Sequence, residues 1–265
     1  MTRPRKLAVL ELLSIAALFA QSAKIDNFFR DFTAEWVRHD PDLATRSRYF
    51  TGAEQDRLER QVTPSTLDFR LARIRMAKQG LAELAKFDRA GLTETQRVST
   101  DSMQSQLQTI VDEEPFMDYS FPLEQLNGVN VGVAFRLTID HPMRTEKDAE
   151  NYLAALGEAG ARMREAIAES RRLGGEGLLP PKFILQATVR QMRGFADPAP
   201  AQNAFVRSFA QKMSAIQSLP EAKREELRAR AEKIVAKQVY PAWKDAIALL
   251  ESQAPRAPMK RASRG

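Results

Sequence analysis

Apolar residues recur at the spacing of an α-helix along most of this chain of 265 residues. A period of 3.6 residues places apolar side chains on one face of each helix and predicts amphipathic helices that pack together. Support for strands is slight, because the stretch richest in β-branched residues, 129–137, is short and contains Gly132. The sequence therefore predicts an all-α fold, an array of several long amphipathic helices.

Capping residues and breakers locate several of these helices. Thr93 with Gln96 is typical of a capping box that begins a helix, and Thr145 with Asp148 is expected to begin another helix. Gly174-Gly175 indicates where the second of these helices ends. A final long helix is expected over residues 220–252, and Pro241 should bend it because the proline ring clashes with the preceding turn.

One segment, residues 114–142, lacks a clear helical face. At this length it is too long to be a mere connector. Segments of this kind are usually functional or packed against the core. We therefore expect one long ordered loop around residues 114–142.

The first 23 residues have the layout of a secretory signal peptide. Basic residues at positions 3, 5 and 6 precede an apolar run over residues 7–20 and a short stretch of small residues. The run is shorter than the about 20 apolar residues that a membrane span needs. We expect a signal peptide over residues 1–23, a periplasmic or secreted protein, and no stable membrane span after its removal. Glu11 favours the alternative, a buried first helix of a cytoplasmic protein, because a carboxylate is costly to insert into a membrane.

The net charge of +6 comes from the two ends of the chain. Residues 24–254 are neutral overall, with both signs interleaved, and this range is the expected helical domain. Residues 255–265 are basic, contain proline and lack periodicity, so they predict a disordered tail. Because nucleic-acid-binding proteins normally carry basic residues on the folded domain itself, no nucleic-acid partner is expected.

The chain has two histidines and no cysteine. A zinc site needs three or four His, Cys or carboxylate ligands, and a Ser-His-Asp triad needs a histidine that is free to act as a base. His39 is expected to interact with the dipole at a helix end. His141, in a loop beside Asp140, is an isolated candidate for a site. The carboxylates of residues 112–114 are expected to be solvated rather than to hold a divalent ion.

Other motifs favour a structural role over binding. Gly157 and Gly160 lie among alanines and are expected to let two helices approach closely. No glycine-rich loop follows a strand, so nucleotide binding has no support. Several arginines are interleaved with acidic or apolar residues and are expected to face solvent: Arg70, Arg73, Arg75, Arg224, Arg228 and Arg230. The sequence therefore assigns no catalytic, cofactor-binding or metal-binding residue and no cofactor.

A series of short motifs resembles, in order and spacing, the bacterial family called "domain of unknown function 885". The motifs are Trp36 with Asp40-Pro41-Asp42-Leu43-Ala44-Thr45, then Pro122-Leu123-Glu124-Gln125-Leu126-Asn127-Gly128-Val129, then Gly177-Leu178-Leu179-Pro180-Pro181-Lys182-Phe183. Further anchors are Thr93 to Arg97, Thr145 to Tyr152 and Tyr240-Pro241-Ala242. The resemblance runs from about Ile25 to Gln253, which is nearly all of the expected mature chain.

The resemblance implies an exported, all-helical protein that is similar to zinc metallopeptidases. Members of the family are typically about twice this long, and their implied catalytic centre is an H-E-x-x-H helix in the C-terminal half. In such a helix two histidines bind zinc and the glutamate activates water. This chain resembles only the N-terminal half and contains no H-E-x-x-H. No catalytic residue of the family therefore has a matching position here.

Two functions follow from these observations. In the first, the chain is the N-terminal helical lobe of a metallopeptidase-like protein, truncated or split, with no catalytic activity of its own. Its partner would be the missing C-terminal catalytic half, or a second copy, covering apolar residues such as Trp243, Ile247 and Leu250 of the last helix. In the alternative, the chain is a self-sufficient periplasmic module that binds a peptide or a protein.

Overall fold

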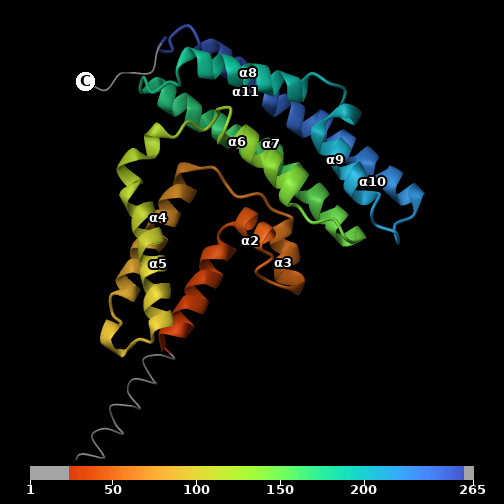
Figure 1. Cartoon of the computed structure of the whole chain (residues 1–265). Coiled ribbons are helices and arrows are strands. Elements are labelled where there is room, and N and C mark those ends of the chain that lie inside the picture. The colour runs from red at the N-terminus through yellow and green to blue at the C-terminus, as the bar shows by residue number, and fades with distance from the viewer. Residues whose placement is uncertain (1–23, 260–265) are drawn as a thin grey trace, which may run out of the picture. The chain divides into compact units, whose positions relative to one another are not determined.

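A computed structural model describes residues 24–259, and every regular element in that range is helical (Figure 1). The prediction of an all-α fold is confirmed. The expected signal peptide, residues 1–23, and the end of the expected tail, residues 260–265, lie outside the described residues. Among the described helices, none combines the length and the apolar character that crossing a membrane requires.

The expected helical domain, residues 24–254, contains two compact units. The described part of unit 1 covers residues 24–39 and 70–117, and that of unit 2 covers residues 40–69 and 118–259. Helix α4 (Leu67–Leu84) contributes its residues from Arg70 onward to unit 1. Each unit has its own set of packed helices.

Unit 1 packs a helix over residues 24–38 and the main part of α4 against α5 (Glu94–Asp112). The predicted capping box is present at the start of α5, where the Thr93 side chain accepts from the Gln96 backbone and the Gln96 side chain accepts from the Thr93 backbone. A short helix, η1 (Arg89–Gly91), precedes α5, and η2 (Glu114–Tyr119) follows it. The unit has a small core in which half-buried aromatic residues surround the buried Ala77, Leu84 and Leu107: Phe28, Phe29, Phe32 and Trp36.

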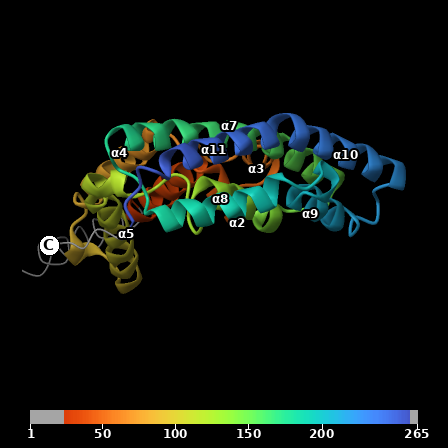
Figure 2. The same cartoon turned by 90° about the horizontal axis from the view of Figure 1, so that it is seen from above.

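Unit 2 is built around α7 (Glu146–Gly175), a helix of 30 residues. Helices α7, α11 (Tyr240–Gln253) and α8 (Lys182–Ala196) lie side by side in both views (Figure 2). The apolar core between them contains large side chains from α7, α9 and α11, among them Tyr152, Phe205 and Trp243. The other elements of the unit are α2 (Pro41–Ser47), α3 (Gly52–Glu59), α6 (Val129–Phe135), η3 (Arg136–Asp140), α8 (Lys182–Ala196), η4 (Pro200–Gln202), α9 (Ala204–Met213), α10 (Glu221–Ile234), η5 (Val235–Val239) and α11 (Tyr240–Gln253).

Pro241 lies in the first turn of α11, directly after the π-helix η5. A π-turn adds one residue to the helical repeat, and here the backbone N–H of Tyr240 donates to the carbonyl of Val235. The chain therefore continues from α10 through η5 into α11. The local widening accommodates the proline at the place where the sequence predicts a disturbed helix.

Gly160 of α7 lies directly against η5. A Cβ atom at Gly160 would come within 3.0 Å of the carbonyl oxygen of Gln238 and would lie 3.1 Å from its carbonyl carbon. The predicted close approach of two helices is thus confirmed at Gly160. At Gly157 the nearest atom would be Gln238 Oε1 at 3.7 Å, which is ordinary contact.

The segment expected to form one long loop, residues 114–142, contains three short helices, η2, α6 and η3. The β-branched residues and Gly132 lower the intrinsic helix propensity of this stretch. Burial of Val133 and Leu137 in the core of unit 2 overrides that low propensity. Tertiary packing therefore decides the structure here.

Two expectations about the end of the chain need correction. Trp243, Ile247 and Leu250 are not left uncovered: they are 1%, 7% and 1% exposed, and Trp243 packs on Phe195 with ring centroids 5.1 Å apart. The first residues of the expected disordered tail also pack on unit 2. Ala257 is buried, and the backbone N–H of Lys182 donates to the carbonyl of Pro258 at 2.9 Å.

Candidate functional site

The residues considered as site candidates from the sequence do not come together. His39 is exposed, directly follows the helix over residues 24–38, and its Nε2 lies 3.0 Å from Glu35 Oε1 of that helix. Asp112 accepts from Gln108 at 2.7 Å, and Glu114 pairs with Lys78 at 2.5 Å. Within residues 24–259, no three His, Asp or Glu side chains are grouped so that they could hold a metal ion.

The arginines expected to face solvent fall into two groups. Arg75, Arg228 and Arg230 are exposed, as expected. The other three are partly buried and each donates to a backbone carbonyl, so for them the expectation is wrong: Arg70 to Met117 at 3.1 Å, Arg73 to Trp36 at 2.6 Å and Arg224 to Ile216 at 2.8 Å. Their long side chains therefore bring the guanidinium groups to backbone carbonyls rather than into solvent.

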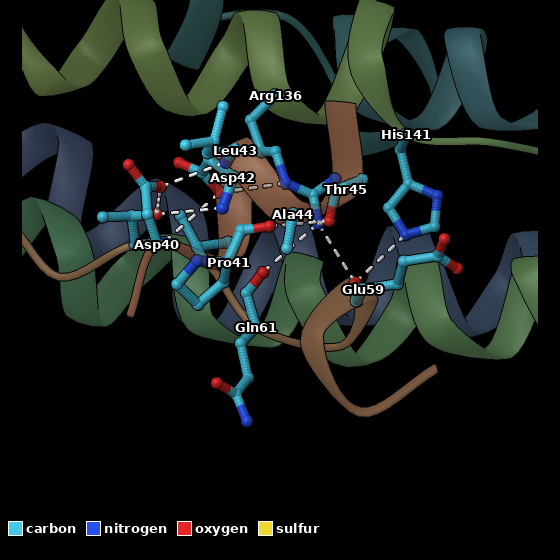
Figure 3. Close-up of polar contacts among 12 residues, drawn as sticks. Asp40, Pro41, Asp42, Leu43, Ala44, Thr45, Glu59, Gln61, Arg136 and His141 are labelled. Atoms are coloured by element: carbon cyan, nitrogen blue, oxygen red, sulfur yellow. Dashed lines mark hydrogen bonds and ion pairs between the residues drawn. The ribbon is translucent and has the colours of Figure 1, made fainter. Parts of the chain in front are cut away.

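The most unusual polar group of unit 2 is Arg136, whose side chain is 1% exposed. Figure 3 shows the Arg136 guanidinium between the α2–α3 segment and η3. Its Nε donates to Asp42 Oδ1 at 2.9 Å, and its Nη2 donates to Thr45 Oγ1 at 2.8 Å. Nη2 also lies within hydrogen-bond distance of the carbonyls of Glu59, at 3.1 Å, and Gln61, at 3.3 Å. One guanidinium thus joins residues from both helices of the α2–α3 segment and the turn that follows α3.

The local structure of α2 presents Asp42 and Thr45 to Arg136. Asp40 caps α2 by accepting from the Leu43 backbone N–H at 3.0 Å. Thr63 donates its hydroxyl to Asp40 Oδ1 at 2.7 Å, and the Asp42 backbone N–H donates to Thr63 Oγ1 at 2.9 Å. This capping network fixes the start of α2 and therefore the position of the Asp42 carboxylate.

Burial and charge oppose each other in the Arg136–Asp42 pair. Burial raises the pKa of Asp42, and the positive charge of Arg136 acts against that rise. Burial lowers the pKa of Arg136, and the charge of Asp42 raises it. A guanidinium stays protonated in proteins, so with Asp42 ionised the two groups form an ion pair in which the Arg136 side chain is 1% exposed and the Asp42 side chain 29% exposed.

His141 lies next to this pair and is buried, with 2% of its surface exposed. Its Nδ1 is 2.8 Å from the Pro142 carbonyl oxygen, and its Nε2 is 3.3 Å from the Glu59 carbonyl oxygen. Burial, together with the nearby charge of Arg136, lowers the pKa of His141 from 6.5 to about 3. A neutral imidazole donates one hydrogen bond, and the shorter distance assigns it to Nδ1.

The π-helix η3 places Arg136 and His141 together. The backbone N–H of His141 donates to the Arg136 carbonyl at 3.0 Å, which closes a turn across five residues. Both side chains consequently face the α2–α3 segment, where each lies near the Glu59 carbonyl. The ring of His141 also makes an edge contact with Tyr152 of α7, at a centroid distance of 5.2 Å.

This arrangement can hold two segments of unit 2 together. Both ring nitrogens of His141 face backbone carbonyls, so neither is directed at a substrate or a metal ion. Sequence reasoning selected His141 but missed Arg136, Asp42 and Thr45. The available signal was a lone arginine in the mostly apolar stretch 129–139, because a charge in such a stretch needs a buried partner.

The model of a bacterial family, DUF885, described as proteins of unknown function, matches residues 41–265. The crystal structure of a candidate lipoprotein from Colwellia psychrerythraea is similar, with a TM-score of 0.71 and 18% sequence identity. The match covers 87% of this chain and 42% of that chain, so this chain spans less than half the length of that protein. No curated protein matches this chain.

Proposed function

This chain belongs to the bacterial family DUF885, and we propose that it is one helical lobe of a larger protein or complex, with no catalytic centre of its own. The match to the Colwellia protein carries this proposal. It includes 87% of this chain but only 42% of that one. The shared fold covers most of this chain but less than half of the Colwellia protein. This is expected if this chain corresponds to one lobe of a larger protein.

The chemistry of the described residues supports a role without catalysis. The family resemblance implies zinc bound by H-E-x-x-H, and the sequence contains no such motif. His141 is turned toward two carbonyls in unit 2, and His39 pairs with Glu35 in unit 1. A tetrahedral zinc site needs three or four converging ligands, so the two histidines do not fit a zinc ion.

The test is metal content together with peptide hydrolysis. The purified chain, dialysed after loading with zinc, should retain far less than one zinc per chain and should not cleave a library of fluorogenic peptides. One tightly held zinc per chain, or peptide cleavage that a chelator abolishes, would overturn the proposal. The exposed His39→Gln variant is a useful control, because it should change neither measurement.

A second candidate function is a self-sufficient module that binds peptides. It is supported by an apolar pocket of about 170 Å³ in unit 1, lined mainly by Phe32, Trp36, Met103, Leu107 and Ile110. Arg73 lies over the Trp36 ring, with its guanidinium carbon 3.4 Å from the ring centroid. A pocket lined mainly by aromatic and aliphatic side chains suits the apolar side chains of a short peptide.

Tryptophan fluorescence separates this second function from the first. The chain has two tryptophans, and Trp243 is 1% exposed, so a titration with Leu- and Phe-containing tripeptides reports mainly on Trp36. Saturable quenching that disappears in Trp36→Phe would favour the binding module. An unchanged spectrum up to millimolar peptide would favour the lobe.

We further propose that the protein acts in the periplasm. The charged, apolar and small residues of positions 1–23 follow the order of a signal peptide, and the similar Colwellia protein is described as a lipoprotein. An intact mass from the periplasmic fraction should show the loss of about 20 residues. A full-length product found only in the cytoplasm would contradict this location.

A further inference from the structure

Two large apolar side chains are exposed on one side of the α6–η3 segment. Phe135 and Ile139 are 58% and 60% exposed, and side chains four residues apart lie on the same side of a helix. Gly132, one turn before Phe135, is also exposed, and a Cβ there would meet no atom within 4 Å. We call Gly132, Phe135 and Ile139 the outer stripe.

The other sides of α6 and η3 are packed within unit 2. Val133 and Leu137 belong to the main core. Arg136 is turned toward the α2–α3 segment. Asn130 donates to Gln191 of α8 at 3.0 Å, and the carbonyl of Thr138 accepts from Ser208 of α9 at 3.2 Å. The outer stripe is therefore the side of this segment that the other described residues of unit 2 leave uncovered.

A lysine lies beside the outer stripe. Lys212 of α9 donates through Nζ to the carbonyls of Ile139, at 3.3 Å, and His141, at 3.1 Å. These bonds hold the ammonium group at the end of the stripe, where the Asp140 carboxylate is also close enough to interact with it. A surface that pairs an apolar ridge with a fixed cation suits an amphipathic helix with a carboxylate next to its apolar face.

We propose that the outer stripe is where the second helical lobe docks, the part corresponding to the length of the Colwellia protein that this chain does not match. This inference rests on the proposed function. More than half of that protein lies outside the match, and a lobe of that size must bury apolar surface against its neighbour. The last helix is not available for this contact, because α7 and α8 already cover Trp243 and Leu250.

The shape of the outer stripe also suits a helix. Ridges of one helix pack into the grooves of another, and a glycine in the contact lets the two backbones approach closely. Gly132 provides such a gap one turn before Phe135. Docking would bury Phe135 and Ile139 and bring a carboxylate of the second lobe to Lys212.

The first test uses the crystal structure of the Colwellia protein. The positions that superpose on Phe135 and Ile139 should lose more than half of their exposed area when the unmatched part of that chain is included. If that part covers another face of the matched region and leaves these positions open, the docking site is wrong but the two-lobed assembly stands. If it makes no contact with the matched region, both the docking site and the proposed function fail.

The second test uses this chain. Wild type, the double variant Phe135→Asp/Ile139→Asp and the control Val98→Asp, at another residue that is 60% exposed, are compared by sedimentation and by binding of a hydrophobic dye. All three should be monomeric with similar melting temperatures, and dye fluorescence should fall at least twofold in the double variant only. A wild-type dimer that the double variant abolishes would assign the outer stripe to a second copy. Equal dye fluorescence in wild type and double variant would show that the stripe is not an accessible docking surface.

Discussion

Adding a single methyl group at Gly160 tests the closest helix contact of unit 2. In Gly160→Ala the new Cβ would meet the carbonyl oxygen of Gln238 well inside van der Waals distance. That oxygen belongs to the backbone of the π-helix η5, so no side-chain rotation can relieve the clash. Either α7 or the α10–η5–α11 helix must move.

The expected loss of stability can be estimated from two opposing effects. Replacing glycine by alanine inside a helix stabilises the protein by about 0.5–1 kcal/mol. Overpacking of a well-packed core costs about 1–3 kcal/mol, and the upper half of that range applies because the contact is with rigid backbone. The net loss is then about 1–2.5 kcal/mol, which corresponds to a fall in Tm of about 2–10 °C for a domain of this size.

Gly157→Ala is the matched control, one turn away on the same helix. Its nearest neighbour, Gln238 Oε1, would be at 3.7 Å, so the gain in helix propensity of about 0.5–1 kcal/mol should raise the Tm. Urea and thermal unfolding followed by circular dichroism measure both variants. If Gly160→Ala is as stable as the wild type, or if both variants lose stability equally, the account of how α7 packs on η5 is wrong.

Further predictions concern the polar cluster of unit 2, formed by Arg136, Asp42, Thr45 and His141. Arg136→Met leaves the half-buried Asp42 carboxylate, whose side chain is 29% exposed, without its cation. It should cost about 3 kcal/mol in urea unfolding, the lower end of the range for breaking a buried pair, whereas the exposed Arg228→Met should cost less than about 0.5 kcal/mol. A loss for Arg136→Met no larger than that for Arg228→Met would contradict the ion pair. The pKa of His141 in the folded chain, about 3, lies below the 6.5 of the unfolded chain, so the unfolded state takes up a proton first, and stability is lost as the pH falls from 6.5 toward 3. The loss should reach roughly 2–3 kcal/mol by pH 4.5, partly offset by Asp42, whose raised pKa acts in the opposite direction, and His141→Gln should flatten the profile. In His39→Gln the single remaining histidine should show, by nitrogen NMR, a neutral ring with its proton on Nδ1 down to about pH 4; protonation near pH 6 would refute the buried environment.

Local signals in the sequence predicted the parts of the fold that depend on neighbouring residues. The capping boxes at Thr93 and Thr145 are both present, because each needs only a side chain and backbone groups within one turn. The close approach at Gly160 was also predictable, because a glycine among alanines makes a thin helix face. Pro241 correctly indicated where the last long helix is irregular, but the sequence could not distinguish a bend from a π-turn.

The polar cluster of Arg136, Asp42, Thr45 and His141 could not be predicted from signals within one turn of the chain. Arg136 and Asp42 are separated by 94 residues in the sequence, and no local pattern connects them. The helical state of α6 depends on burying Val133 and Leu137, which is also a tertiary effect. Helices α7 and α8 pack on α11. The apolar face with Trp243 and Leu250 is therefore buried within unit 2, which the sequence of α11 alone does not reveal.

We infer that this chain works as one lobe of a larger assembly. The most direct measurement is the native mass of the protein isolated from its own cells under gentle conditions. We predict a particle heavier than the 29.8 kDa of this chain, containing additional helical sequence with an H-E-x-x-H motif. A particle no heavier than this chain, active in binding peptides by itself, would contradict the claim.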